Sequence, residues 1–209
     1  MDIDNIEVGY SKIADKYTKT FFDELNYKPL DRYLLEKFCN GIRGKGKVCD
    51  LGCGPGHVSR FIKDQGIDVC GIDLSDGMLK KAKEKNPDIE FTKGNMINLE
   101  TKEKSFAGII LYYSIVHFTI KEVEEVFVNL GNILENNGLL FLAFHVGDEV
   151  LHIDSLFDEE VKLDYNFFNT DEIVRILNKH KYRLIEALTR YPYDEEYGSK
   201  KGYIICQKL

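Results

Sequence analysis

Apolar side chains recur at helical spacing through the first part of the chain. Within residues 5–24, the apolar residues from Ile6 to Tyr17 stand three or four positions apart, as on one face of a helix. A second stretch with the same spacing begins after Pro29. We therefore expect two helices that form an N-terminal helical cap over residues 1–44.

Beyond this cap, short apolar runs alternate with amphipathic stretches of helical period. The predicted strands are 47–51, 68–73, 88–94, 105–114 and 138–146, and the predicted helices are 57–65, 76–85, 121–136 and 170–182, the last with Thr170 as its N-cap. Two further apolar stretches, 182–193 and 202–209, have only a polar turn between them and should pair as an antiparallel hairpin. Apolar strands alternating with helices are typical of a doubly wound α/β fold, with a mostly parallel sheet covered on both faces.

Composition narrows the class of protein. The 209 residues, of which 44% are apolar, suffice for a single domain over 1–209. A net charge of −7 argues against a nucleic-acid partner, which needs a basic face. The N-terminus lacks the pattern of a signal peptide, and the longest apolar run, 106–118, is short of the ~20 residues of a membrane helix. We expect a cytoplasmic monomer or homodimer without a membrane partner, with its five cysteines reduced.

A glycine-rich turn, VCDLGCGPGH, includes the end of the first predicted strand. Gly52, Gly54 and Gly56 allow a sharp turn and a close approach of the backbone to a ligand. Their G-x-G-x-G spacing differs from the G-x-G-x-x-G of dinucleotide sites, and the phosphate-loop signature is absent. The turn is interpreted as a site for a ligand without phosphates, or else as a plain tight turn.

Asp73, which ends the second predicted strand in CGIDLS, favours the ligand interpretation. An acid at this strand end can accept hydrogen bonds from both hydroxyls of a ribose. The alternative is that Asp73 caps the next helix, but Ser75 and Asp76 can do so unaided. We therefore expect Asp73 to be free for an adenosine.

These motifs resemble those of the class I S-adenosylmethionine-dependent methyltransferases. VCDLGCGPGH, GIDLSDGML, KGNMINL, FAGIILYYSIVHF and ILENNGLLFLAFH stand in the order and spacing of that family, and the likeness covers about residues 5–209. The resemblance implies a Rossmann-like seven-stranded sheet with its last strand antiparallel. It also implies S-adenosylmethionine as cofactor, S-adenosylhomocysteine as product, and a small molecule as methyl acceptor.

The resemblance also assigns residues to the cofactor. The implied contacts are Tyr10, Tyr17, Gly52, Cys53, Gly54, Asp73, Leu74, Met78, Asn95, Met96, Leu111 and Tyr112. The turn residues belong to the methionine end, Asp73 to the ribose and Asn95 to the adenine edge. Many relatives carry Asp where Asn95 stands, and the amide carbonyl can accept the same hydrogen bond.

Two histidines are candidates for catalysis. His117 follows the fourth predicted strand and His145 ends the fifth, so both should lie on the ligand side of the sheet. A base is needed if the acceptor is a hydroxyl, and histidine titrates near neutral pH. The alternative is that each histidine merely bonds a carbonyl at a strand end. His145, Asp148, His152 and Asp154 fit no standard metal spacing, so no metal is expected.

Residues 147–168 form a long connection that we interpret as a lid over the substrate pocket. The segment contains seven acidic residues and one lysine. One hypothesis is that these acids select a substrate with an amine or other positive group. The alternative is a solvated acidic surface.

Other functions remain compatible with the sequence. The same fold could transfer another alkyl group from a sulfonium, such as aminopropyl, or bind an adenosine cofactor without any transfer. A nicotinamide-dependent oxidoreductase is disfavoured by the glycine spacing. An RNA or protein methyltransferase is disfavoured by the acidic charge and by the lack of a recognition domain.

Overall fold

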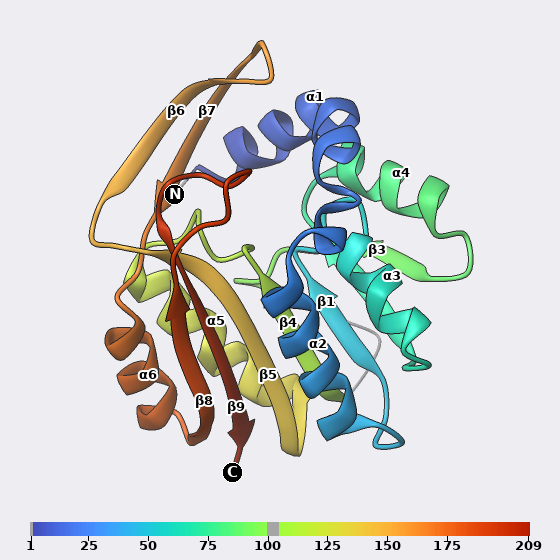
Figure 1. Cartoon of the computed structure of the whole chain (residues 1–209), viewed down its shortest axis with the longest axis vertical. Coiled ribbons are helices and arrows are strands. Elements are labelled where there is room, and N and C mark those ends of the chain that lie inside the picture. Colours follow the sequence, from blue (N-terminus) through green and yellow to red (C-terminus); the bar gives the residue numbers. More distant parts are fainter. Residues whose placement is uncertain (1, 100–104) are drawn as a thin grey trace.

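Seven strands form one sheet in the order β3–β2–β1–β4–β5–β9–β8 (Figure 1). The computed structural model describes residues 2–99 and 105–209. The strands of this sheet are β1 (Val48–Leu51), β2 (Val69–Asp73), β3 (Glu90–Lys93), β4 (Phe106–Tyr112), β5 (Leu134–Val146), β8 (Tyr182–Arg190) and β9 (Lys200–Lys208). Pairs among β1 to β5 are parallel, whereas β9 runs antiparallel to both β5 and β8. The predicted sheet and its antiparallel C-terminal hairpin are confirmed.

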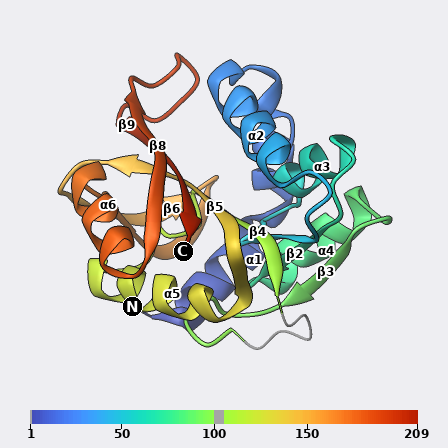
Figure 2. The same cartoon turned by 90° about the horizontal axis from the view of Figure 1, so that it is seen from below.

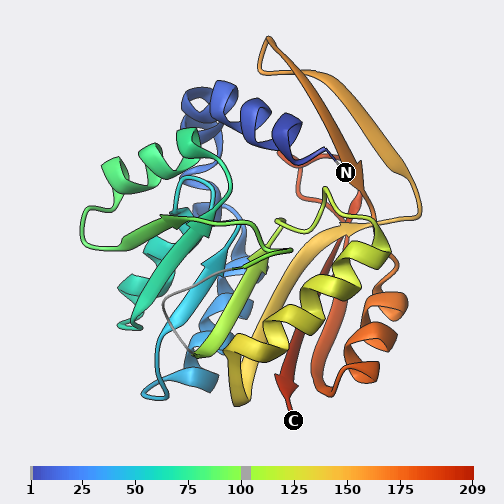
Figure 3. The ribbon, with the colours of Figure 1, turned by 180° about the vertical axis from the view of Figure 1, so that it is seen from behind.

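Helices cover both faces of the sheet, as Figures 2 and 3 show. The helices are α1 (Ile3–Phe21), α2 (Pro29–Ile42), α3 (His57–Asp64), α4 (Asp76–Lys85), α5 (Ile120–Ile133) and α6 (Thr170–Lys179), with a 3-10 turn, η1, at Glu24–Asn26. Alternate residues of β4 face opposite layers. Ile110 packs in the cluster formed with α2 and α3, and Ile109 packs in the cluster formed with α5 and α6.

Two local predictions need correction. The N-cap of α6 is Asn169, whose side chain accepts hydrogen bonds from the amides of Asp171 and Glu172, and Thr170 is the first helical residue. Asn is as good a cap as Thr, and here it stands one position earlier. Strand β5 begins at Leu134, where the sequence predicted the end of a helix, and Asn137 has a positive φ within it.

Residues 147–168 are not an irregular connection. They contain a two-stranded antiparallel hairpin of β6 (Val150–Leu156) and β7 (Glu159–Asn166). The two-residue loop, Phe157–Asp158, has positive φ at both positions, which matches the twist of the flanking strands. We call β6 and β7, with the loop that joins them, the hairpin.

The hairpin and α1 together cover the carboxyl ends of the parallel strands (Figures 1 and 3). Their contact is an apolar cluster in which Ile13 and Ala14 of α1 meet Met78 of α4 and Val161 and Leu163 of β7. Because β7 alternates apolar and polar residues, one of its faces is buried on α1 while the other meets solvent.

Candidate functional site

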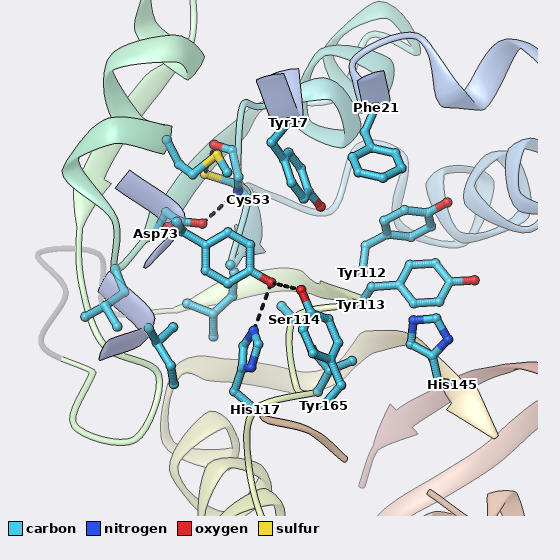
Figure 4. Close-up of a pocket in the computed structure, with 18 of the residues that line it drawn as sticks. Tyr17, Phe21, Cys53, Asp73, Tyr112, Tyr113, Ser114, His117, His145 and Tyr165 are labelled. Carbon is cyan, nitrogen blue, oxygen red and sulfur yellow. Dashed lines mark hydrogen bonds between the residues drawn. The ribbon is translucent and has the colours of Figure 1, made fainter. Parts of the chain in front are cut away.

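A cavity of about 400 Å³ lies between the carboxyl ends of the strands and the cover made by α1 and the hairpin. Figure 4 shows Asp73 and Cys53 on one side of it and His145 on the other. The predicted site residues that line this cavity are Tyr10, Tyr17, Gly52, Cys53, Gly54, Asp73, Leu74, Met78, Asn95, Met96, Tyr112, His117 and His145. The fold therefore gathers residues from distant parts of the chain at one place.

Leu111 is the one predicted cofactor contact that does not line the cavity. It is fully buried in the cluster beneath α5, on the opposite face of the sheet from Tyr112. Successive residues of a strand point to opposite faces, so neighbours in β4 cannot both face the same side. The structure thus separates two residues that the resemblance placed together.

The glycine turn has the backbone that its sequence predicts. Gly52, Gly54 and Gly56 have φ values of +75°, +53° and +81°. A Cβ on Gly52 would lie 2.3 Å from the Cβ of Ser114, whereas a Cβ on Gly54 would meet nothing within 4 Å. Gly52 is therefore required by the packing of the turn against the loop after β4. Gly54 lines the cavity, and the space beside its Cα is open.

Asp73 holds this turn in place. Its Oδ2 accepts a hydrogen bond from the amide of Gly54 at 2.7 Å, and its Oδ1 accepts one from the amide of Ser75 at 2.8 Å. Burial raises the pKa of Asp73, and the two amide bonds partly offset this effect. Ser75 caps α4 by accepting from the amide of Met78, so capping is independent of Asp73. Each carboxylate oxygen of Asp73 thus accepts from one backbone amide and keeps a lone pair for a further donor.

His117 is joined to both parts of the cover. Its Nδ1 lies 2.8 Å from the carbonyl oxygen of Asp164, its Nε2 lies 2.9 Å from the hydroxyl of Tyr10, and that hydroxyl lies 3.0 Å from the hydroxyl of Tyr165. A carbonyl only accepts, so Nδ1 carries the proton. Burial lowers the pKa of His117 to about 4, which leaves the ring neutral. Tyr10 therefore donates to Nε2, and Tyr165 donates to Tyr10.

Comparisons with known proteins agree with the geometry. A family profile described as a methyltransferase domain matches residues 48–138. An uncharacterized methyltransferase of Alkaliphilus oremlandii is 25% identical over 191 residues, which cover 88% of this chain and 81% of the relative. A trans-aconitate 2-methyltransferase of Agrobacterium fabrum is 32% identical over 133 residues, which cover 63% of this chain and 46% of that protein.

The fold has a close counterpart among solved structures. A complex of the protein DhpI with S-adenosylhomocysteine aligns with a TM-score of 0.77 and 16% identity, and the alignment covers 99% of this chain and 96% of that one. Residues 48–138 thus match a methyltransferase-domain profile, and the chain shares the fold of S-adenosylmethionine-dependent methyltransferases. The DhpI complex contains S-adenosylhomocysteine, and the similar structures of a glycopeptide N-methyltransferase (14% identity, TM-score 0.66) and a magnesium protoporphyrin IX methyltransferase (17% identity, TM-score 0.64) contain S-adenosylmethionine.

The cavity extends beyond the glycine turn and Asp73 toward His145. The Nδ1 of His145 lies 2.7 Å from the hydroxyl of Ser199, and the ring stacks on Phe167 at a centroid distance of 5.2 Å. Burial and the nearby charges of Lys201 and Lys28 lower the pKa of His145 to about 3. The ring is therefore neutral at physiological pH and a poor base.

A buried polar network beside His145 was missed by the sequence analysis. Lys28 lies 2.7 Å from Glu24 and 3.1 Å from Glu196, and Arg190 pairs with Glu196 and with Asp31. Burial opposes ionisation of Glu196, but Arg190, the amide of Tyr193 and Lys28 lower its pKa to about 2. These residues come from η1, the start of α2, the end of β8 and the turn before β9, and none of them belongs to a sequence motif.

Two further polar atoms at the cavity make no hydrogen bond within residues 2–99 and 105–209. They are Nδ1 of His57, at the start of α3, and Oγ of Ser114, after β4. A buried polar atom left unpaired is destabilising, so each is a place where a bound molecule can contribute a hydrogen bond. The ring of His57 packs edge-on against the ring of Tyr112, and Ser114 lies against Gly52 of the glycine turn.

The acids of residues 147–168 do not line the cavity. Asp148, Glu149, Asp154, Asp158, Glu160 and Asp164 are exposed, and Glu159 is half-buried beside Lys16. The hairpin contributes apolar and aromatic side chains instead, namely Leu151, Ile153, Leu156 and Tyr165. The hypothesis that these acids select a cationic substrate therefore has no geometric support, and the solvated-surface alternative fits the structure.

Among residues 2–99 and 105–209, no three His, Cys, Asp or Glu side chains are grouped as a metal site would need. Within the part of the chain that the structure describes, none of the helices has the length and apolar character to cross a bilayer. All five cysteines are buried.

Proposed function

We propose that this methyltransferase transfers the methyl group of S-adenosylmethionine to a small molecule held inside the covered cavity. The observation that carries the proposal is the cover itself. Helix α1 and the hairpin enclose the carboxyl ends of the strands and are tied together through Tyr10, His117 and Tyr165. A macromolecular acceptor would require this cover to open, whereas a small acceptor fits beneath it.

The glycine-turn side of the cavity is assigned to the cofactor. Gly52, Cys53 and Gly54 contact the methionine part, Asp73 accepts from the ribose hydroxyls, and the adenine lies among Leu74, Met78, Asn95 and Met96. Supporting this assignment, all eight line the cavity, and the carboxylate of Asp73 already stabilises the turn. Tyr10, Tyr17 and Tyr112 would close the site over the bound cofactor.

The reaction is an in-line displacement in which the protein supplies placement. An electron pair on the acceptor forms a bond to the methyl carbon, the carbon–sulfur bond breaks, and its electrons return to the sulfur. Neither His117 nor His145 suits direct proton abstraction, because both are neutral rings of low pKa and His117 has both nitrogens occupied. We therefore assign them to positioning, with an acceptor atom that needs no strong base.

Calorimetry with S-adenosylmethionine, S-adenosylhomocysteine and NAD tests the cofactor site. The two sulfur ligands should bind and NAD should not. Asp73→Ala should weaken binding by at least ~10-fold, since a hydrogen bond to a charged group contributes about 1.5–3 kcal/mol. Asp76→Ala, an exposed acid in the same segment, is the matched control. If a folded wild-type protein binds neither sulfur ligand, the proposal fails.

Product analysis tests the group transferred. A set of small acceptors is incubated with protein and S-adenosylmethionine, and the products are examined by mass spectrometry. An added methyl group, with S-adenosylhomocysteine formed in equal amount, supports methyl transfer. An added aminopropyl group from the decarboxylated cofactor, or cofactor binding without acceptor-dependent turnover, would instead support one of the alternative functions.

A further inference from the structure

Lys201 is a buried cation that has no carboxylate partner. Its Nζ donates to the carbonyl oxygens of Tyr197 and Ser199 and to the hydroxyl oxygen of Ser199, at 2.7, 2.9 and 3.2 Å. Only 2% of the residue is exposed, and it lines the cavity. No acidic side chain of the described residues lies within salt-bridge distance of it, although a buried charge is normally paired.

The neighbouring carboxylates are occupied by other cations. Glu24 is bonded to Lys28 and His57, Glu196 to Arg190 and Lys28, and Asp31 to Arg190. Each of these carboxylates therefore contacts another cation, and none of them bonds the ammonium of Lys201 directly. Burial and the cations Arg190 and Lys28 lower the pKa of Lys201 to about 8 while Glu196 opposes the shift, so the ammonium form still prevails at neutral pH.

The ammonium of Lys201 sets the direction of the hydrogen bonds that follow. An ammonium group can only donate, so Oγ of Ser199 accepts from it. The hydroxyl proton of Ser199 is then directed to Nδ1 of His145, 2.7 Å away. A neutral imidazole that accepts at Nδ1 carries its proton on Nε2.

The Nε2–H of His145 is therefore a donor with no partner among the described residues. The ring lines the cavity and is surrounded by aromatic side chains, stacked on Phe167 and edge-on to Tyr197, with Tyr113 tilted against it. The site combines a flat apolar surface with one hydrogen-bond donor that a buried positive charge polarises.

We propose that this end of the cavity binds the carboxylate of a small planar acceptor, through the Nε2–H of His145 and the charge of Lys201 relayed by Ser199. The inference rests on the proposed function, since it concerns the acceptor of the same cavity. It concerns how the acceptor binds, whichever of its atoms receives the methyl group. A cationic acceptor would offer no hydrogen-bond acceptor to the Nε2–H of His145 and would lie near the ammonium of Lys201.

The test uses three probes of the same shape and different charge. Protein saturated with S-adenosylhomocysteine is titrated at pH 7 with benzoate, benzyl alcohol and benzylamine. Benzoate should bind, at least ~10-fold tighter than the other two, because charge-assisted hydrogen bonds are about twice as strong as neutral ones. Benzylamine or benzyl alcohol binding as tightly as benzoate overturns the inference, as does a lack of benzoate binding.

Variants separate the relay from general packing. Lys201→Met keeps the length of the side chain and removes a buried unpaired charge, so the fold should be retained. The substitution should lower the affinity for benzoate by about 10-fold and leave the affinity for S-adenosylhomocysteine unchanged. Lys201→Arg should restore part of the affinity for benzoate. Lys200→Met, an exposed neighbour, is the control. Unchanged benzoate affinity in Lys201→Met sinks the inference.

A spectroscopic readout follows the proton on His145. Nitrogen NMR should show the Nε2–H tautomer in the wild type, and the Nε2–H signal should shift when benzoate binds. Ser199→Ala should disturb the tautomer, which a merely structural role for the hydroxyl would not. A protein that binds no S-adenosylhomocysteine removes the proposed function and this inference together. Binding of that ligand without benzoate removes only the inference.

Discussion

The hydroxyl of Tyr10 lies 2.9 Å from Nε2 of His117 and joins α1 to the loop that follows β4. The other nitrogen of His117 donates to the carbonyl of Asp164 in β7, and Tyr165 donates to the hydroxyl of Tyr10. Four hydrogen-bonding groups thus tie the two parts of the cover to the sheet. We call them the latch, and they explain why a histidine near the cofactor has no nitrogen left for a substrate.

Tyr10→Phe should loosen the latch without emptying the core. The ring still packs against Tyr17, but His117 and Tyr165 lose a hydrogen-bond partner, and a buried unsatisfied group costs about 1–3 kcal/mol. We expect S-adenosylhomocysteine to bind ~5- to 100-fold more weakly by calorimetry and the amides of β7 to exchange hydrogen faster. Tyr33→Phe, on the exposed face of α2, should change neither. Equal effects of the two variants would contradict the latch.

The buried His117 of the latch should make the stability of the fold depend on pH. The pKa of His117 falls from 6.5 in the unfolded chain to about 4 in the fold, chiefly through burial. Between these values the unfolded chain binds a proton that the folded protein does not, so stability decreases as the pH falls from 6.5 to about 4. The contribution of one group is at most about 1.4 kcal/mol per pH unit.

Urea unfolding at several pH values measures this slope. His117→Gln should flatten it, and direct NMR titration of the wild-type imidazole should give a midpoint well below 6.5. His145, whose pKa falls to about 3, contributes a second proton in the same direction and should be compared by His145→Phe. A His117 ring that titrates at its ordinary pKa would contradict the assigned direction of the Tyr10 hydrogen bond.

The sheet and the cofactor motifs could be predicted because they are local patterns. Apolar strands, helical spacing and the glycine turn each lie within a few consecutive residues, and the strands of the sheet appear in the predicted order, although β5 begins earlier than predicted. The hairpin was also within reach, since Val161, Leu163 and Tyr165 alternate with Lys162 and Asp164. Its many charges favoured a loop interpretation, but they belong to one solvent-facing side of two strands.

Of the residues around His145, only His145 itself was predicted, because the others meet it only through the topology. Lys28, His145, Arg190 and Lys201 come from four separate elements and carry no motif. Burial then reverses the expected chemistry of the histidine, since a ring that looks like a base in sequence becomes a neutral donor beside a buried ammonium. Leu111 shows the same limit on a smaller scale, because only the strand direction decides which side it faces.

The glycine turn offers a pair of substitutions with different outcomes. Gly52→Ala adds a methyl group 2.3 Å from the Cβ of Ser114 at a φ of +75°, so both the collision and the left-handed backbone destabilise the fold. Gly54→Ala meets no protein atom within 4 Å, and its cost of about 1–2 kcal/mol comes from the backbone alone.

Thermal unfolding and calorimetry together distinguish these effects. Gly52→Ala should lower Tm much more than Gly54→Ala does. Gly54→Ala should still weaken the binding of S-adenosylhomocysteine, because its methyl group enters the cavity. Gly198→Ala, in an open turn with no positive φ, is the control. A Gly54→Ala protein with normal cofactor affinity would argue that the cofactor does not lie against the turn.

The packing of the hairpin on α1 should keep the cover of the cavity closed. Only 2% of Leu163 is exposed. Its side chain packs against α1, where a Cβ added to Gly9 would lie 3.3 Å from Cδ2 of Leu163. Leu163→Ala therefore removes packing between two elements that cover the cavity, a change that costs about 2–5 kcal/mol in a closed core. Since the hairpin pairs with itself rather than with the main sheet, we expect much of this loss to appear as local opening.

Limited proteolysis should reveal that opening at the turn formed by Phe157 and Asp158. Leu163→Ala should be cut there faster than the wild type and bind S-adenosylhomocysteine more weakly, with a smaller change in the unfolding of the sheet. Lys162→Ala removes an exposed side chain from the same strand and should behave as the wild type. If the two variants lose cofactor affinity equally, the closure of the cavity does not depend on the buried face of the hairpin. The cover would then have to be held by the latch alone.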